Sequence, residues 1–165
     1  MAINTVSEKY LHELGDIYDA ENQFLEAQQE ALSQASDSVL REGIQHHIEE
    51  TREQIQNLEA VYEHLGQKPR PETCQAARGI VTEGQKNMKE AGSDHIRDCL
   101  IGGALAKVEH YEMASYRGLI VGAQQMGQED IERLLQQNLL QEEHTAQKLE
   151  ENAPMLIKRA LQAEA

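Results

Sequence analysis

The sequence predicts an all-α fold built as a four-helix bundle, and three observations support this. Ala, Leu, Gln and Glu are abundant and runs of β-branched residues are few, which is typical of helical proteins. The prolines, Pro69, Pro71 and Pro154, leave long stretches without a strong helix breaker. Four of these stretches carry apolar residues at helical spacing. The chain of 165 residues is expected to form a single domain over residues 1–165.

The first two helices are expected to form a hairpin. The first spans about residues 5–34, and the second runs from about residue 37 to residue 65. Ser36 or Asp37 can cap the second helix, and Gly66 suits the position after its end. The apolar stripes are Tyr10, Leu14, Ile17, Tyr18, Phe24, Leu25 and Leu32, then Leu40, Ile44, Ile48, Ile55, Leu58, Tyr62 and Leu65.

A second hairpin follows a long connection over about residues 67–92, in which a short helix is expected near residues 72–90. The third helix is expected over residues 93–126, and Gly127 marks a tight turn before a fourth helix that ends near residue 152. Because proline suits the first position of a helix, Pro154 predicts a separate short helix at the C-terminus. The inward residues are Ile101, Leu105, Val108, Tyr116 and Leu119, then Ile131, Leu134, Leu135, Leu139 and Leu149.

The lengths of the links predict the topology. Short links make each hairpin antiparallel. The second helix is roughly 40 Å long at 1.5 Å per residue, and a connection of about 26 residues can return along it. The second and third helices would then be parallel, which is the ferritin-like arrangement. The alternative is an up-and-down bundle with a decorated loop.

The charge and the two cysteines limit the classes of function. A net charge of −14 argues against nucleic acid and against an anionic membrane surface. No apolar run approaches the roughly 20 residues of a membrane span, and the N-terminus lacks the pattern of a signal peptide. Cys74 and Cys99 lie far apart without a CxxC motif. They indicate free thiols in a reducing compartment, so we expect a cytoplasmic protein.

Three glutamates lie at the centre of apolar stripes, where a lone carboxylate is costly. They are Glu21, Glu112 and Glu142. Glu21 lies 15 residues before Ser36, and Glu112 and Glu142 lie 15 residues before and after Gly127. Glu50 lies 14 residues after Ser36. Because equal distance from a hairpin turn means equal height, the four carboxylates are expected in one layer, roughly 22 Å from the turns.

A layer of carboxylates repels itself unless it shares protons, pairs with a base or binds cations. Iron and manganese suit carboxylate ligands, and bundles with one Glu per helix hold two metal ions. We therefore expect a di-metal site of Glu21, Glu50, Glu112 and Glu142, assisted by Glu109. Further side chains that could support these ligands are His47 and Gln54, beside Glu50, and Tyr18, Tyr111 and Tyr116.

Four stretches resemble the ferritin-like YciE/YciF-type bacterial stress proteins. They are DIYDAENQFLEA around Glu21, HHIEETREQIQNLE around Glu50, KVEHYEMASYRGL around Glu109 and Glu112, and LLQEEHTAQKL around Glu142. The likeness extends over nearly the whole chain. It implies a ferritin-like fold, a homodimer, a bacterial cytoplasmic setting and a role in stress, with metal ligands at these five glutamates. It implies no defined activity.

The sequence departs from ferritin-like sites, which usually carry Glu-x-x-His on two helices. Here the third residue after Glu50 is Glu53, and the third after Glu142 is Thr145. Relatives often have His where this chain has Gln54. A ferritin-like storage cage is a weaker alternative, because the resemblance favours small oligomers, and two main functions therefore remain open. One is a stress protein with two iron or manganese ions that react with oxygen or peroxide, and the other is a non-catalytic dimeric scaffold without a functional metal. Whether the chain is an enzyme is left open.

Overall fold

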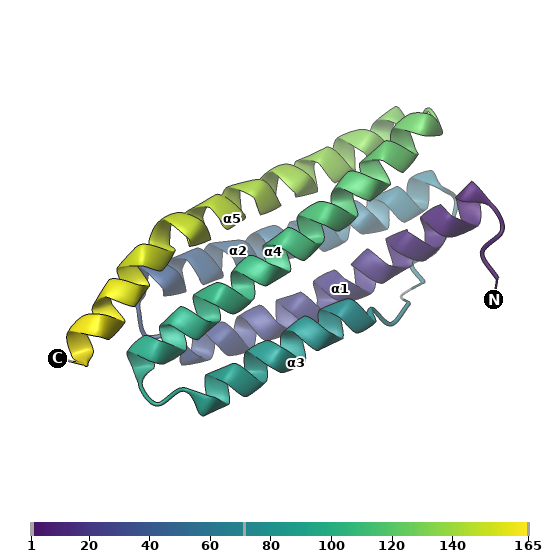
Figure 1. Ribbon diagram of the computed structural model, residues 1–165. Helices are drawn as coiled ribbons and strands as arrows, with labels where there is room; N and C mark the ends of the chain where they lie inside the picture. The colour runs from purple at the N-terminus through teal and green to yellow at the C-terminus, as the bar shows by residue number, and fades with distance from the viewer. Residues whose placement is uncertain (1, 71, 165) are drawn as a thin grey trace.

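The computed structural model describes residues 2–70 and 72–164, and within them the secondary structure is entirely helical. Four long helices form the bundle, and a shorter one lies along its side (Figure 1). No helix within this part is long and apolar enough to cross a membrane. The elements are α1 (Val6–Gln34), α2 (Ser38–His64), α3 (Gln75–Glu90), α4 (Asp94–Gln125) and α5 (Glu129–Ala163).

Local sequence signals set most helix ends. Thr5 caps α1, and Glu8 completes a capping box with it. Asp37 caps α2 through its side chain. Gly66 and Gly127 have φ of 64° and 67°, a left-handed conformation that favours glycine, and they follow the ends of α2 and α4. The expected helix ends in the two hairpins are therefore confirmed to within a residue or two, except for the C-terminal end of the fourth helix.

The long connection is confirmed as a crossover. It contains α3, which packs on α1 and α4 and carries the chain back along the bundle, so that α2 and α4 run in the same direction (Figure 1). The up-and-down alternative is therefore wrong. Helix α3 begins at Gln75 rather than near residue 72, because Cys74 caps it. The Sγ atom of Cys74 accepts from the backbone N–H of Ala77 at 3.3 Å.

The expected break at Pro154 is wrong, because α5 continues through this residue to Ala163. Proline removes one helical hydrogen bond and costs about 3 kcal/mol in a helix interior. The last turns offset this cost by packing, since Leu156 and Ala160 are buried beyond the proline. Arg159 also forms an ion pair with the buried Asp37 at the start of α2. In Figure 1 the C-terminal part of α5 bends rather than breaks.

The core has an apolar cluster at each end and a polar layer between them. On α4, Ile101 and Leu105 belong to one cluster and Leu119 to the other, and the buried Glu109 and Glu112 lie between them. A similar order recurs on α2 and α5, whereas on α1 Glu21 lies between Ile17 and Phe24 of one cluster. The buried polar residues of this middle region are Glu21, Gln28, His47, Thr51, Gln54, Glu109, Glu112, Asn138 and Glu142.

Candidate metal centre

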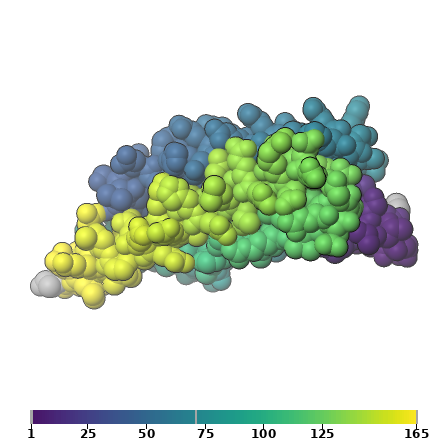
Figure 2. Space-filling model, turned by 90° about the horizontal axis from the view of Figure 1, so that it is seen from above, coloured from purple at the N-terminus to yellow at the C-terminus, as the bar shows by residue number. Residues whose placement is uncertain are grey.

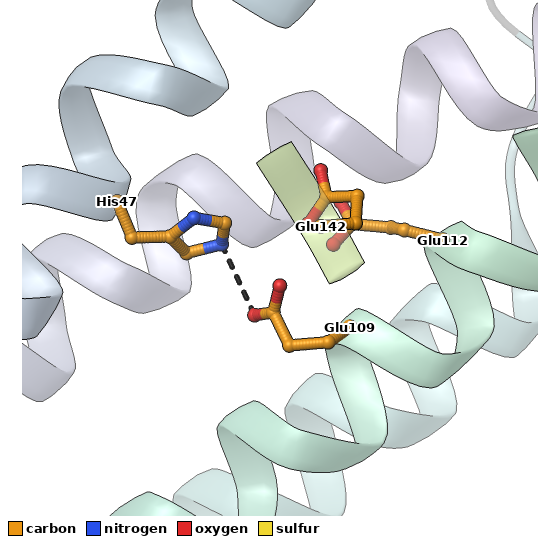
Figure 3. Close-up of side chains that lie close together, drawn as sticks. All are labelled: His47, Glu109, Glu112 and Glu142. Atoms are coloured by element: carbon orange, nitrogen blue, oxygen red, sulfur yellow. Dashed lines mark ion pairs between the residues drawn. The ribbon is translucent and has the colours of Figure 1, made fainter. Parts of the chain in front are cut away.

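Four ionisable side chains converge inside the bundle. His47 comes from α2, Glu109 and Glu112 from α4, and Glu142 from α5 (Figure 3). Each offers one ligand atom, and these atoms all lie within 4.8 Å of one another. His47 is 2% exposed and the three glutamates are fully buried. We call these four residues the central cluster.

Helical spacing and hairpin symmetry bring the cluster together. Glu109 and Glu112 are three residues apart, so they project from one face of α4. Glu112 and Glu142 stand at equal distances from Gly127, and the antiparallel packing of α4 and α5 brings them to the same height. The structure therefore brings together three of the five glutamates expected from the sequence.

Glu21 lies beside the cluster but is not one of the four mutually close residues. It is fully buried, and its Oε1 accepts a hydrogen bond from the Tyr116 hydroxyl. That hydroxyl also accepts from Asn138 Nδ2 at 3.1 Å. Glu21 Oε2 lies without a hydrogen-bond partner among the described residues, and burial together with the charge of Glu21 raises the pKa of Glu112. Glu21 therefore extends the carboxylate group toward α1.

Glu50 lies at the outer edge, on the far side of His47. One of its oxygens lies 3.3 Å from His46 Nε2, and the other lies 3.6 Å from His47 Nδ1. The hydroxyl of Thr145 donates to Glu50 at 3.2 Å. The expectation that Glu50 would complete the central layer is therefore only partly met, because it contacts the cluster through His47.

Burial dominates the electrostatics of the carboxyl groups. It raises the pKa of Glu112 and of Glu142 well above the ordinary value, and the charges of neighbouring glutamates add to the effect. Burial also raises the pKa of Glu21 to about 7, against the lowering effect of the hydrogen bond from Tyr116. Carboxyl groups in this environment hold protons unless a cation compensates their charge.

His47 is the cationic partner of the cluster. Burial by itself would lower its pKa, but the negative charge of Glu109 and the contacts with Glu109 and Glu50 outweigh burial and raise the pKa to about 10. Its Nε2 lies 3.1 Å from Glu109 Oε1 (Figure 3). The two atoms are at ion-pair distance without the direction of a hydrogen bond, so both keep free bonding capacity. One imidazolium cannot balance all the buried carboxyl groups.

The cluster holds an unusual number of unpaired polar atoms. Both carboxyl oxygens of Glu109, Glu112 and Glu142 lack a hydrogen-bond partner among the described residues, and so do both amide atoms of the buried Gln54. Buried polar atoms are rarely left unpaired, because each one costs about 1–3 kcal/mol. Three carboxylates and an imidazole whose ligand atoms lie within 4.8 Å of one another have the chemistry of a site for hard or intermediate cations. The residues present therefore fit a metal.

Of the expected supporting residues, Tyr116 contacts a carboxylate of the site, because its hydroxyl donates to Glu21. Gln54 is fully buried, and its side-chain amide makes no hydrogen bond among the described residues. His47 belongs to the central cluster itself, rather than to its surroundings. Its position three residues before Glu50 was the available signal, because residues three apart share a helix face.

Tyr18 and Tyr111 do not contact the cluster through their hydroxyl groups, contrary to expectation. The Tyr18 hydroxyl donates to Glu59 at 3.0 Å, and its ring packs edge-on against Tyr62. The Tyr111 hydroxyl donates to Asp16 at 2.8 Å and lies 3.0 Å from the Cys74 thiol. Both side chains lean out of the bundle core toward neighbouring helices, a direction that residue spacing alone does not give.

Asn138 is a polar neighbour that the sequence reasoning missed. It is fully buried on α5, and its Nδ2 donates to the backbone carbonyl of Gln54 at 3.2 Å as well as to Tyr116. Asn57 donates to its Oδ1 at 2.7 Å. The signal was its place four residues before Glu142, on the same face of the helix.

Comparison with known proteins agrees with this arrangement. Residues 5–162 match the family described as Domain of unknown function (DUF892). The chain is 32% identical to Protein YciF of Escherichia coli over 150 residues, which cover 90% of each protein. The chain belongs to the DUF892 family. The resemblance to YciF-type proteins seen in the sequence is therefore confirmed.

Similar solved structures share the fold. The E. coli stress protein YciF superposes with a TM-score of 0.89 at 31% identity, covering 94% of this chain and 99% of that one. YcfI of Rhodopseudomonas palustris, described as a candidate structural protein, gives 0.88 at 38% identity, covering 90% and 94%. A Xanthomonas campestris protein gives 0.78 at 23% identity, covering 98% and 99%, and shows the fold alone.

Proposed function

We propose that this DUF892 protein is a stress-response protein whose bundle holds two iron or manganese ions. The central observation is the group of buried, unpaired carboxylates beside His47. His47, Glu109, Glu112 and Glu142 would hold the metal, with Glu21 and Glu50 at the two ends. Metals of this kind, when bound, supply electrons to oxygen or peroxide. Cys74 and Cys99 are free thiols, as a reducing cytoplasm requires.

The protein residues prepare the site in three ways. Burial limits the access of water to the carboxylates. The hydrogen bond from Tyr116 fixes the orientation of Glu21. The Glu50 carboxylate lies beside His47 Nδ1 at 3.6 Å, where it can orient the ring and leave Nε2 for a metal. The order of residues on α2 is His47-x-x-Glu50, the reverse of the usual Glu-x-x-His.

The test is the metal content of the purified protein, by plasma mass spectrometry after expression with added iron or manganese. The parent is expected to carry about two ions per chain. Glu112→Gln and Glu142→Gln should each lose most of the metal. Glu143→Gln is the matched control, because Glu143 is exposed and pairs with Arg117, and it should keep parental metal content.

The second candidate function is a non-catalytic homodimeric scaffold, in which the carboxyl groups share protons. It is supported by the exposed apolar side chains near the end of α5, namely Met155, Ile157 and Leu161. It is also supported by the description given to YcfI. Folded parent protein that contains no transition metal would favour this function over the first. Light scattering would then test the dimer directly.

A further inference from the structure

A groove of about 490 Å³ opens between α2 and α5 and reaches the central cluster. Figure 2 shows the two helices that border it, with α2 in blue and the C-terminal part of α5 in yellow. Leu105 and Glu109 of α4 form its floor. The cluster is therefore buried but not sealed.

The inner end of the groove is polar. His47, Glu109 and Thr145 line it there, whereas Glu21, Glu112 and Glu142 do not. A molecule in the groove would therefore meet the cluster from the His47–Glu109 side. Both residues are buried and keep atoms without a hydrogen-bond partner among the described residues. They can bind the polar group of an incoming molecule.

The walls of the groove are apolar and its size exceeds that of oxygen or peroxide. Leu40, Ile44, Leu105 and Leu149 supply most of the walls, and Val39 is 53% exposed at the rim. A water-sized molecule needs only about 30 Å³, whereas sites for organic molecules typically measure about 300–1,000 Å³. The groove therefore has the size of a site for an organic molecule.

The groove is lined by groups of both charge signs, which gives an ion of either sign a repulsive neighbour. Glu42 and Glu151 line it together with Lys148, His46 and His47, and the chain as a whole carries −14. An anion would meet repulsion from this rim and from the glutamates beyond it. A neutral molecule avoids that repulsion and still gains from the apolar walls.

We infer that the groove binds a neutral, mainly apolar organic molecule with its one polar group against His47 and Thr145. This inference deepens the proposed function by naming the ligand class of the same site. Its binding step depends on the walls and on the polar inner end rather than on the metal, so it can be measured in metal-free protein.

Binding can be tested with N-phenyl-1-naphthylamine, a neutral apolar dye whose fluorescence rises in apolar surroundings. The blocking variant is Gly43→Phe, because Gly43 lines the groove and a Cβ added there meets no atom within 4 Å. The control is Gly118→Phe, a helical glycine outside the groove with the same open surroundings. Both changes replace a poor helix former, so both variants should fold.

The parent and Gly118→Phe should bind one dye per chain, and Gly43→Phe should bind it at least about tenfold more weakly. 1-Decanol should displace the dye at a concentration at least about tenfold below that of decanoate at pH 8, because only decanoate is charged. Equal dye binding by Gly43→Phe and the parent would overturn the inference. So would a Gly43→Phe variant that changes from dimer to monomer, because the groove would then be an interface.

The two proposals fail separately. The parent protein could take up no metal and still bind the dye, with binding lost in Gly43→Phe. That result would support the groove and refute the metal site. Two metal ions per chain without saturable dye binding would refute the binding groove and support the metal site. Metal content in Gly43→Phe should equal that of the parent, because Gly43 is not among the candidate ligands.

Discussion

Tyr116 links the carboxylate group to the polar residues around it. Its hydroxyl is fully buried, donates to Glu21 and accepts from Asn138. Removing the hydroxyl leaves Glu21 Oε1 without its donor and Asn138 Nδ2 with only its bond to the Gln54 carbonyl, and an unpaired buried polar group costs about 1–3 kcal/mol. Tyr116→Phe should therefore lower the free energy of unfolding by about 2–4 kcal/mol in urea melts.

Tyr18→Phe is the matched control for that prediction. The Tyr18 hydroxyl bonds to Glu59 at an exposed position, so its loss should change stability by less than about 0.5 kcal/mol. Equal destabilisation by the two variants would mean that Tyr116 acts through the packing of its ring alone.

At the level of single residues, the buried glutamates could be predicted from the sequence and their neighbours only in part. A carboxylate in the middle of an apolar stripe stands out, and equal spacing from Gly127 pairs Glu112 with Glu142. The hydroxyl of Tyr18 points to Glu59 instead of the cluster, a choice set by side-chain rotamers and local packing. The sequence predicts His47 only as a supporting residue, because Glu50, one turn on, is the expected ligand.

At the level of elements, the turn between α1 and α2 depends on a residue from α4. Asp98 is buried and accepts hydrogen bonds from the backbone N–H of Ser36 at 2.8 Å and of Asp37 at 3.0 Å. It also accepts from the Ser36 hydroxyl at 2.5 Å. The sequence contains no local sign of this contact, because the partners are 62 residues apart.

Asp98→Ala should destabilise the protein by about 3 kcal/mol, because hydrogen bonds to a charged group contribute about 1.5–3 kcal/mol each and do not add fully. Chemical denaturation monitored by circular dichroism would measure it. Glu83→Ala is the comparison, because Glu83 forms an exposed ion pair with Lys107 and both side chains are 56% exposed. It should cost less than about 1 kcal/mol. Similar losses in both would show that Asp98 does not hold the turn.

The continuity of α5 through Pro154 predicts a substitution that stabilises the protein instead of destabilising it. Pro154 removes one backbone hydrogen bond from a helix whose later residues, Leu156 and Ala160, are buried. Pro154→Ala restores the N–H and should stabilise the protein by about 1–2 kcal/mol, less than the full helix cost because the unfolded chain also gains freedom. The midpoint of thermal unfolding should rise. A lower midpoint would indicate that the bend itself is needed to seat the last turns.

At the level of the whole molecule, the buried polar layer makes the free energy of unfolding depend on pH. The folded pKa is raised for Glu21, to about 7, and for Glu112 and Glu142, from an ordinary value of 4.5. Each group therefore binds protons more tightly when folded, so its stabilising effect is full below pH 4.5 and is lost as pH rises. For Glu21 the loss is complete above about pH 7.

His47 also stabilises the folded protein less as pH rises, but over a higher pH range. Its folded pKa of about 10 exceeds the ordinary 6.5, so its contribution is full below pH 6.5 and is lost as pH rises toward 10. Glu50 opposes this trend only in acid, because its pKa is lowered and its contribution is lost as pH falls below 4.5. Metal-free protein should therefore become less stable as pH rises from 5 to 9 in urea melts with a chelator.

Bound metal should make the stability of the protein increase with pH instead of decrease. Metal ligands must be deprotonated, so affinity rises with pH, and a ligand that binds only the folded state stabilises it. Urea melts with excess Mn²⁺ should then show stability that increases between pH 5 and 7, whereas Glu112→Gln should give the same curve with and without the ion. Parallel curves for the parent with metal and with chelator would mean that the carboxyl groups keep their protons, and the scaffold function would account for the polar layer.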